Sequence, residues 1–195
     1  RRYYSNSSSL TYMVPPRTTI IGMLAGLLGY PRDGYYETFS LEACQIGLAV
    51  QSPVKKLVQK MNYLMVKGLQ DLNGSKEHHS QSAVELVMPQ FIRTGLIDYK
   101  VWVHHQDPMV EAKLEKLFSD STIGYRSFGV SLGLGSAQHL GWVEYEGIEE
   151  ASLIHEESEV PVSSLVPTRH VLELLSGPWM TNYRLMKDEL TLEFD

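Results

Sequence analysis

Three consecutive residues near the start of the chain could bind an anion. Arg17, Thr18 and Thr19 follow Pro15 and Pro16, where the sequence predicts the beginning of a helix. Free N–H groups and the positive end of the helix dipole favour a phosphate at such a position. The alternative is that the threonines cap the helix and Arg17 is solvated, and these residues alone leave both interpretations open.

A glycine-rich segment, residues 124–141, could bring backbone N–H groups close to a phosphate chain. It is predicted to follow a helix and precede a strand, which is the reverse of the order in a dinucleotide-binding fingerprint. Tight turns are the alternative use of these glycines. The candidate donors are Gly129, Ser131, Gly133, Gly135, Ser136, Gln138 and Gly141.

Aromatic and basic side chains at the start of the chain could bind single-stranded RNA. Tyr3, Tyr4 and Tyr12 lie near Arg1 and Arg2, and such a set combines base stacking with phosphate contact. The alternative is that the tyrosines complete a strand and face a core, which we expect for at least one of them.

A second basic set is formed by Lys55, Lys56 and Lys60. Lysines along a strand often form a solvated edge that discourages aggregation, and they can equally hold an RNA backbone.

Acid–base chemistry has weaker support in the sequence. RNA cleavage without a metal needs a general base and acid near the 2′-hydroxyl, for which Lys60, Tyr63 and His79 are chemically adequate. Their spacing does not single them out. His104 and His105 are adjacent on a predicted strand and point to opposite sides, so we expect no metal site and no cofactor there.

Composition indicates a folded protein with an uneven charge distribution. The chain has 195 residues, one cysteine (Cys44) and a net charge of −6, which fits one domain in a reducing compartment. Residues 1–70 carry eight Lys/Arg and three Asp/Glu (+5), and residues 71–195 carry nine and twenty (−11). The acidic stretch 144–159 favours a basic protein partner over a phosphate backbone. The absence of a signal peptide or long apolar run predicts a soluble, cytoplasmic protein without membrane contact.

Hydrophobic periodicity predicts the elements that must position these residues. An apolar stripe predicts a helix that starts at Pro15–Pro16, ends at Gly29 and Pro31, and is closely approached at Gly22 and Gly26. A second helix is predicted to start at Asp107–Pro108. The stripe consists of Ile20, Leu24, Leu27 and Leu28, and strands are predicted over Cys44–Gln51, Ile97–His104, Trp142–Tyr145 and Leu190–Phe194.

This order predicts an α+β fold, the ferredoxin-like βαββαβ pattern of RRM and RAMP domains, with its first strand missing because nothing before Pro15 has a convincing strand pattern. Residues 52–96 form an insertion too long for a turn, with extended arms over Val54–Val66 and Ala83–Met88, and we interpret it as a protruding thumb hairpin. The predicted domain spans residues 1–145, and an acidic extension with β structure spans residues 146–195.

The chain resembles the CRISPR-associated RAMP subunits of the Cas-five family, especially those of type I-B complexes. The segments KKLVQKMNYL, SQSAVELV and YRSFGVSLGLGSAQHL resemble the family's two thumb arms and its glycine-rich segment, so the resemblance spans roughly residues 1–145. The N-terminal motif of the family is carried by Ser8, Leu10, Tyr12, Pro15, Pro16, Arg17, Thr18, Thr19, Gly22, Met23, Leu24, Ala25 and Gly29.

The resemblance implies a subunit of the Cascade surveillance complex in antiviral defence that holds the 5′ handle of the crRNA. Its implied partners are Cas-seven backbone subunits, which it caps, a Cas-eight-type large subunit, and target DNA indirectly through guide pairing. The implied handle site contains Arg17, Thr18, Ser131, Gly133, Gly135 and Gln138. Lys55, Lys56 and Asn62 would lie along the thumb, and Arg2, Ser8 and Arg126 complete the predicted RNA-binding set.

The resemblance to type I-B subunits implies no catalysis, because a separate Cas-six subunit cleaves the precursor in those systems. A branch of the family in type I-C systems cleaves the crRNA precursor itself, so a metal-independent endoribonuclease is the alternative. A ferredoxin-like scaffold that binds only protein is a third hypothesis.

Overall fold

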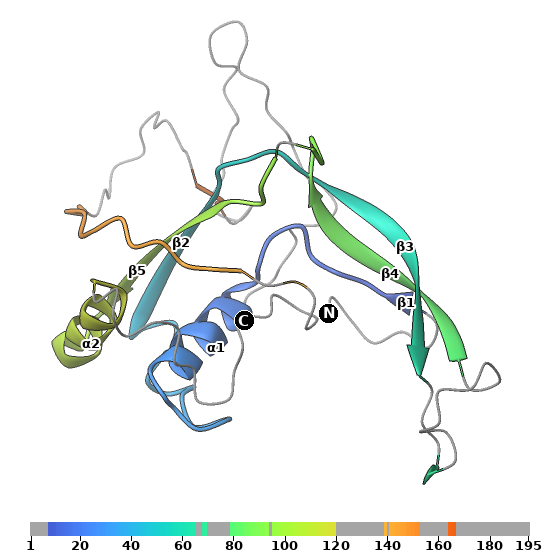
Figure 1. Cartoon of the computed structure of the whole chain (residues 1–195). Helices are drawn as coiled ribbons and strands as arrows, with labels where there is room; N and C mark the ends of the chain where they lie inside the picture. The colour runs from blue at the N-terminus through green and yellow to red at the C-terminus, as the bar shows by residue number, and fades with distance from the viewer. Residues whose placement is uncertain are drawn as a thin grey trace, which may run out of the picture. The chain divides into compact units, whose positions relative to one another are not determined.

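The computed structural model of the chain describes residues 8–64, 68–69, 79–93, 95–119, 139, 141–152 and 164–166. These residues contain two helices and five strands, which agrees with the predicted α+β class (Figure 1). In chain order the elements are β1 (Ser8–Ser9), α1 (Arg17–Leu27), β2 (Cys44–Val50), β3 (Val54–Leu64), β4 (His79–Pro89), β5 (Tyr99–His105) and α2 (Pro108–Ser119).

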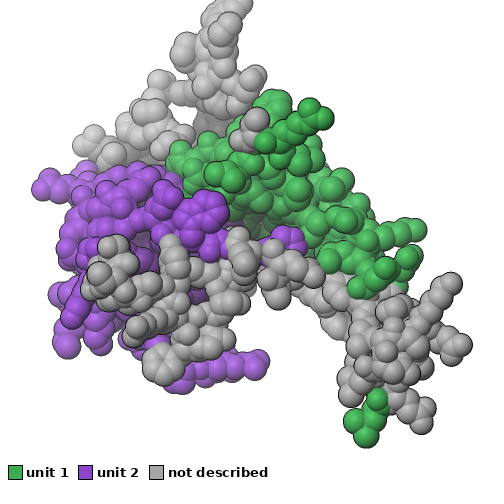
Figure 2. All heavy atoms as spheres, viewed as in Figure 1, with its two compact units in different colours: residues 1–14, 50–99, 166–195 green, residues 15–49, 100–165 purple. Residues whose placement is uncertain are grey.

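The chain divides into two compact units, which Figure 2 colours separately. Unit 1 comprises Arg1–Val14, Val50–Tyr99 and Val166–Asp195, and unit 2 comprises Pro15–Ala49 and Lys100–Leu165. The middle segment of unit 1 contains β3 and β4 and includes the insertion predicted at residues 52–96. The predicted division at residue 145 stays a prediction.

Unit 1 contains a three-stranded sheet in the order β1-β4-β3. β3 and β4 are antiparallel, and their register runs from Val54 opposite Pro89 to Leu64 opposite His79 (Figure 1). The extended arms predicted for the insertion are therefore present, with the returning arm beginning at His79.

The short strand β1 differs from the prediction, because no strand was expected before Pro15. Ser8 and Ser9 pair in parallel with Ala83 and Val84 of β4. Two serines carry no apolar alternation, so only their backbone pairing reveals them as strand. The complete βαββαβ arrangement stays a prediction, since the described strands form the three-stranded sheet and a separate pair, β2-β5.

A small buried group surrounds the base of the hairpin in unit 1. Met13, Val14, Val54 and Val84 are buried. The hydroxyl of Tyr99 donates to the carbonyl oxygen of Met13 at 2.7 Å, and burial raises the pKa of Tyr99 to about 12. This contact ties the segment before α1 to the start of β5.

Unit 2 is built on the strand pair β2-β5 with the two helices. The N–H of Gln106 donates to the Ala43 carbonyl just beyond one end of the pair, and that of Gln51 to the Asp98 carbonyl beyond the other, so the strands are antiparallel. The buried residues of the helices are Ile20, Ile21, Leu24, Ala25 and Leu27 in α1 and Val110 and Leu114 in α2.

The predicted helix boundaries are largely confirmed. Pro16 is the N-cap of α1, so the helix begins at Arg17, one residue later than expected. Gly29 adopts a φ of 81° immediately after the helix, as predicted for its end. At α2, the carboxylate of Asp107 accepts the N–H of Met109 at 2.9 Å, and Pro108 occupies the first helical position.

An aromatic cluster around Phe39 forms the centre of unit 2. Phe39 is fully buried, and its ring lies 5.9 Å from that of Tyr30, 6.4 Å from that of Tyr35 and 5.6 Å from that of His105. A side chain at Gly22 would meet the Tyr35 hydroxyl at 3.1 Å, which confirms the close approach predicted for this glycine.

The prediction of a strand over Trp142–Tyr145 is wrong. Residues 141–152 are described and contain neither helix nor strand. Side-chain contacts from Glu146 and Glu149 to β5 position this segment in place of a backbone ladder. The strand predicted over Leu190–Phe194 lies outside the described residues.

Neither helix among the described residues has the length and apolarity that a bilayer crossing requires.

Candidate nucleic-acid interface

Arg17 binds the protein's own backbone. Its Nη2 donates to the carbonyl oxygens of Phe39, Ser40 and Cys44 at 3.0, 2.8 and 2.8 Å. These bonds fix the first turn of α1 to the segment that leads into β2. An arginine that satisfies three carbonyls stabilises the fold.

Two residues near Arg17 are Cys44, whose pKa is shifted, and Thr18, which is exposed. Burial raises the pKa of Cys44, and the positive charge of Arg17 opposes that rise. Thr18 is exposed in the first turn of the helix. An RNA contact by Arg17 or Thr18 stays a prediction.

The hairpin lysines have three different environments. Lys55 Nζ donates to the carbonyl oxygen of Gln90 at 3.0 Å. Lys56 lies 3.5 Å from Glu85, and these two side chains are only 15% and 22% exposed. Lys60 is exposed, and within the described part of the chain nothing pairs with its amine. Lys60 is therefore the lysine of this set that is available to a phosphate.

The sheet register of unit 1 brings several predicted residues together. Ser8 pairs with Ala83, and Ala83 pairs with Lys60, so these three positions form one row across β1, β4 and β3. Adjacent strands lie about 4.8 Å apart, which places Ser8 and Lys60 on the order of 10 Å from each other. Asn62, two residues beyond Lys60, is exposed on the same face.

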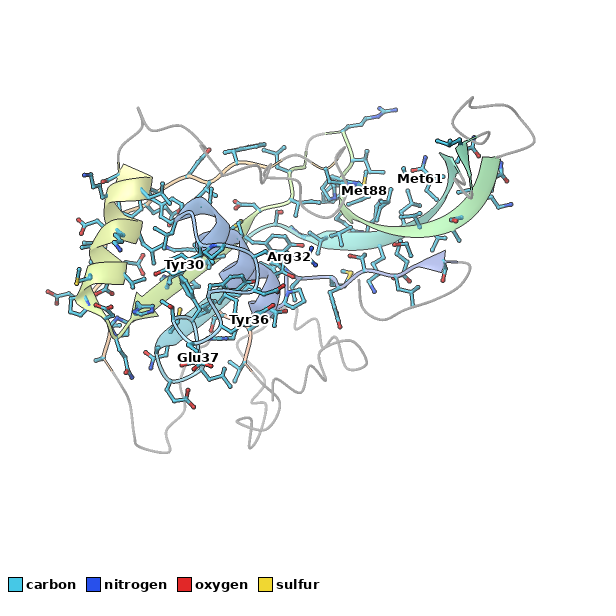
Figure 3. All side chains as sticks on the ribbon, turned by 90° about the horizontal axis from the view of Figure 1, so that it is seen from below. Tyr30, Arg32, Tyr36, Glu37, Met61 and Met88 are labelled. Carbon is cyan, nitrogen blue, oxygen red and sulfur yellow. The ribbon has the colours of Figure 1, made fainter. Side chains whose placement is uncertain are left out.

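The half of this hairpin face that carries Lys60 and Asn62 has the chemical groups that a nucleic-acid strand requires. The ammonium group of Lys60 can contact a phosphate. The amide of Asn62 and the hydroxyl of Ser8 are of the kind that bonds to bases or to a 2′-hydroxyl. In Figure 3 this hairpin is marked by Met61 and Met88. Those methionines belong to the opposite face, because Lys60 and Met61 are consecutive strand residues and Met88 pairs with Lys55.

The comparison with known families concerns the part of the chain that contains this hairpin. Residues 1–89 match the sequence model of the family described as CRISPR-associated protein (Cas_Cas5). This region is similar to the Cas5 family. The match ends at Pro89, the last residue of β4, so it includes β1, α1, β2 and the whole hairpin. A search of curated proteins finds no match to the chain.

The residues considered for RNA cleavage are not placed on one face of the hairpin. The register pairs position 63 with 80 and position 64 with 79. Since successive strand positions alternate, positions 63 and 79 belong to opposite faces of the hairpin. Of the three candidates Lys60, Tyr63 and His79, the backbone therefore separates the last two.

The two histidines of β5 have separate surroundings. The N–H of Asp107 donates to His105 Nδ1 at 2.9 Å, so Nε2 carries the proton and donates to the Thr38 carbonyl at 2.8 Å. His105 is thus a buried, neutral core residue. His104 is exposed and contacts Glu111 at 3.0 Å. In the described part of the chain, no cluster of three potential metal ligands occurs.

Half of the predicted RNA-binding set lies outside the described residues, and those contacts stay predictions. These residues are Arg2, Arg126, Ser131, Gly133, Gly135 and Gln138.

Sequence reasoning missed a cluster on β5. Lys100 Nζ lies 2.8 Å from Glu146 and 2.9 Å from Glu149, and Trp102 Nε1 donates to Glu149 at 2.8 Å. Hydrogen bonds to Glu146, the larger contribution, and to Glu149 raise the pKa of Lys100. The hydrogen bond from Lys100 lowers the pKa of Glu149. The alternation along β5 contained this signal, because Lys100, Trp102 and His104 share the face opposite Tyr99, Val101 and Val103.

Proposed function

We propose that this Cas5-family protein is a non-catalytic crRNA-binding subunit of a type I-B-like Cascade complex, holding the 5′ handle in the cytoplasm. The observation that carries the proposal is the family match over residues 1–89, which includes the hairpin with its exposed Lys60 and Asn62. In this role the subunit caps a backbone of Cas-seven subunits and contacts a Cas-eight-type large subunit. It meets target DNA only through the guide.

The hairpin supports the proposal through its distal face. The row from Ser8 to Lys60, with Asn62 beside it, offers one cation and several hydrogen-bonding groups to a single strand. Phosphate contacts position a strand without reading its sequence, while hydroxyl and amide groups can recognise bases and the 2′-hydroxyl. Such a surface suits a constant RNA segment that must be held in one place.

The absence of catalysis is part of the proposal, and metal-independent cleavage is its alternative. Cleavage needs an acid and a base on the same side of the scissile phosphate. The hairpin register assigns position 63 to the face opposite positions 60 and 79, which argues against cleavage by the three residues acting together.

The test uses the full chain and a labelled repeat RNA in metal-free buffer. One portion runs on a native gel and the other on a denaturing gel. We expect a band shift with intact RNA, and a weaker shift for Lys60→Ala than for wild type. A specific cut at the base of the repeat hairpin, lost in a Lys60→Ala/Tyr63→Phe/His79→Ala variant, would instead establish the endoribonuclease. Absence of both shift and cut would overturn the RNA-binding function.

A further inference from the structure

On β5 the cation of Lys100 lies over the aromatic ring of Trp102. Lys100 Nζ lies 5.1 Å from the centroid of the Trp102 ring. On the neighbouring strand β2, a side chain at Gly47 would meet Cε3 of Trp102 at 3.3 Å. The indole therefore rests against bare backbone, which supports it as a platform. His104, 61% exposed, follows on the same face.

Two carboxylates of the chain occupy this platform. Glu146 and Glu149 bind Lys100, and Glu149 also accepts the indole N–H. Both carboxylates remain well exposed, at 66% and 58%. Exposed ion pairs are weak and are screened by salt. Since residues 141–152 contain neither helix nor strand, the carboxylates can be replaced without breaking a backbone ladder.

We propose that Lys100 and Trp102 form a second binding site for single-stranded nucleic acid, which Glu146 and Glu149 occupy as intramolecular competitors. An aromatic ring in contact with a cation is the combination that stacks a base and binds its phosphate. The carboxylate oxygens stand where phosphate oxygens would bind. The site uses none of the residues assigned to the 5′ handle, and it rests on the proposed function only in taking a nucleic acid as ligand.

If Glu146 and Glu149 compete with the nucleic acid, the affinity of the site depends on which acidic residues are removed. A strand that binds must displace Glu146 and Glu149 from Lys100, so their charge opposes binding directly. Glu144 belongs to the same segment, but its carboxylate accepts the Trp142 indole N–H at 2.9 Å and does not contact β5. Glu150 is also exposed, and within the described residues it makes no contact with Lys100 or Trp102. These two acids therefore provide a matched control.

The test measures binding of a fluorescent eight-nucleotide oligouridine to the full chain by anisotropy. Two double variants are compared, Glu146→Gln/Glu149→Gln and Glu144→Gln/Glu150→Gln. Each removes two negative charges from the segment, so the general electrostatic change is the same. We expect the first variant to bind about three- to tenfold more tightly than the second at low salt, the range for losing exposed ion pairs. Equal affinities would overturn the competition.

Lys100→Met tests the platform itself. The methionine keeps an apolar stem over Trp102, and circular dichroism checks that the variant is folded. We expect it to abolish the gain of the first double variant, whereas an unchanged gain would overturn the site. If repeat RNA still shifts on the native gel in that case, the handle-binding function stands without this second site. A chain that binds neither RNA overturns both proposals.

Discussion

The first turn of α1 and the distal half of the β3–β4 hairpin use their cations in opposite ways. In the first region, the Arg17 guanidinium donates to three carbonyls and the neighbouring Phe39 is fully buried. In the second region, Lys60 and Asn62 are exposed. Both regions contain predicted RNA-binding residues, but only the hairpin presents its cation to solvent. The number of nearby backbone acceptors thus decides whether a basic residue stabilises the fold or remains available to a ligand.

The same contrast occurs within the hairpin. Lys56 and Lys60 lie on one face of β3, four residues apart. Lys56 is largely buried beside Glu85, whose Oε2 also accepts the N–H of Thr11 at 3.0 Å. Lys60 lies beyond this network. The hairpin therefore changes from a base whose lysine is paired to a distal part whose lysine is exposed.

Removing the centre of the buried region has the largest expected effect. Phe39→Ala deletes a fully buried ring that contacts Tyr30, Tyr35 and His105, and should lower the free energy of unfolding by about 3–5 kcal/mol. Urea denaturation followed by circular dichroism measures this loss. Tyr36→Ala is the control, because Tyr36 is 54% exposed, and we expect a loss under about 1 kcal/mol. Equal losses would contradict a core centred on Phe39.

The next largest effect is a difference in stability between variants of two arginines, Arg17 and Arg32. Arg17→Ala leaves three carbonyls without their charged donor and should cost about 2–3 kcal/mol of unfolding free energy. Arg32→Ala should change it by less than about 0.5 kcal/mol, because that side chain is 95% exposed. Denaturation midpoints of both variants give the comparison.

Handle affinity of the same two variants tests the RNA contact predicted for Arg17. The measurement is made where both proteins are folded. A loss of affinity in Arg17→Ala without a loss of stability would show that the guanidinium leaves its carbonyls to bind RNA.

The two hairpin lysines should differ in which property they control. Lys56→Ala leaves Glu85 largely buried without its cation and should cost about 1–2 kcal/mol of unfolding free energy. Lys60→Ala should leave stability within about 0.5 kcal/mol. It should instead reduce the slope of log affinity against log salt for RNA by about 0.7, one phosphate contact to a single strand. A salt slope that changes only in Lys56→Ala would reverse the assignment.

Local patterns predicted most of the described elements. The stripe of α1, the alternation of β5 and the Asp107–Pro108 start of α2 each follow from neighbouring residues, so the sequence contains them. β1 and the segment 141–152 were missed because their structure depends on distant partners. Ser8 and Ser9 form a strand only through β4, and no strand among the described residues pairs with Trp142–Tyr145.

The candidate site was predictable in residue type but not in availability. The sequence identified the hairpin lysines and Arg17 as cations that could bind phosphate. It could not show that Cys44, Ser40 and Phe39 would direct their carbonyls at Arg17, or that Glu85 would face Lys56. Those partners are 22 to 29 residues away along the chain, beyond the reach of local periodicity.

The smallest expected effect concerns the contact between Glu149 and Lys100 of β5. It tests whether this exposed ion pair is weak. Hydrogen bonding from Lys100 lowers the pKa of Glu149 in the folded protein. The contact between Glu149 and Lys100 should therefore be complete above about pH 4.3, which is the usual pKa of a glutamate. It should be lost as the pH falls through the lowered pKa of Glu149. Trp102 fluorescence, with Trp142 and Trp179 replaced by Phe, should report the release while far-ultraviolet circular dichroism stays constant. Glu149→Gln should remove this transition, and its persistence in that variant would assign the release to another group.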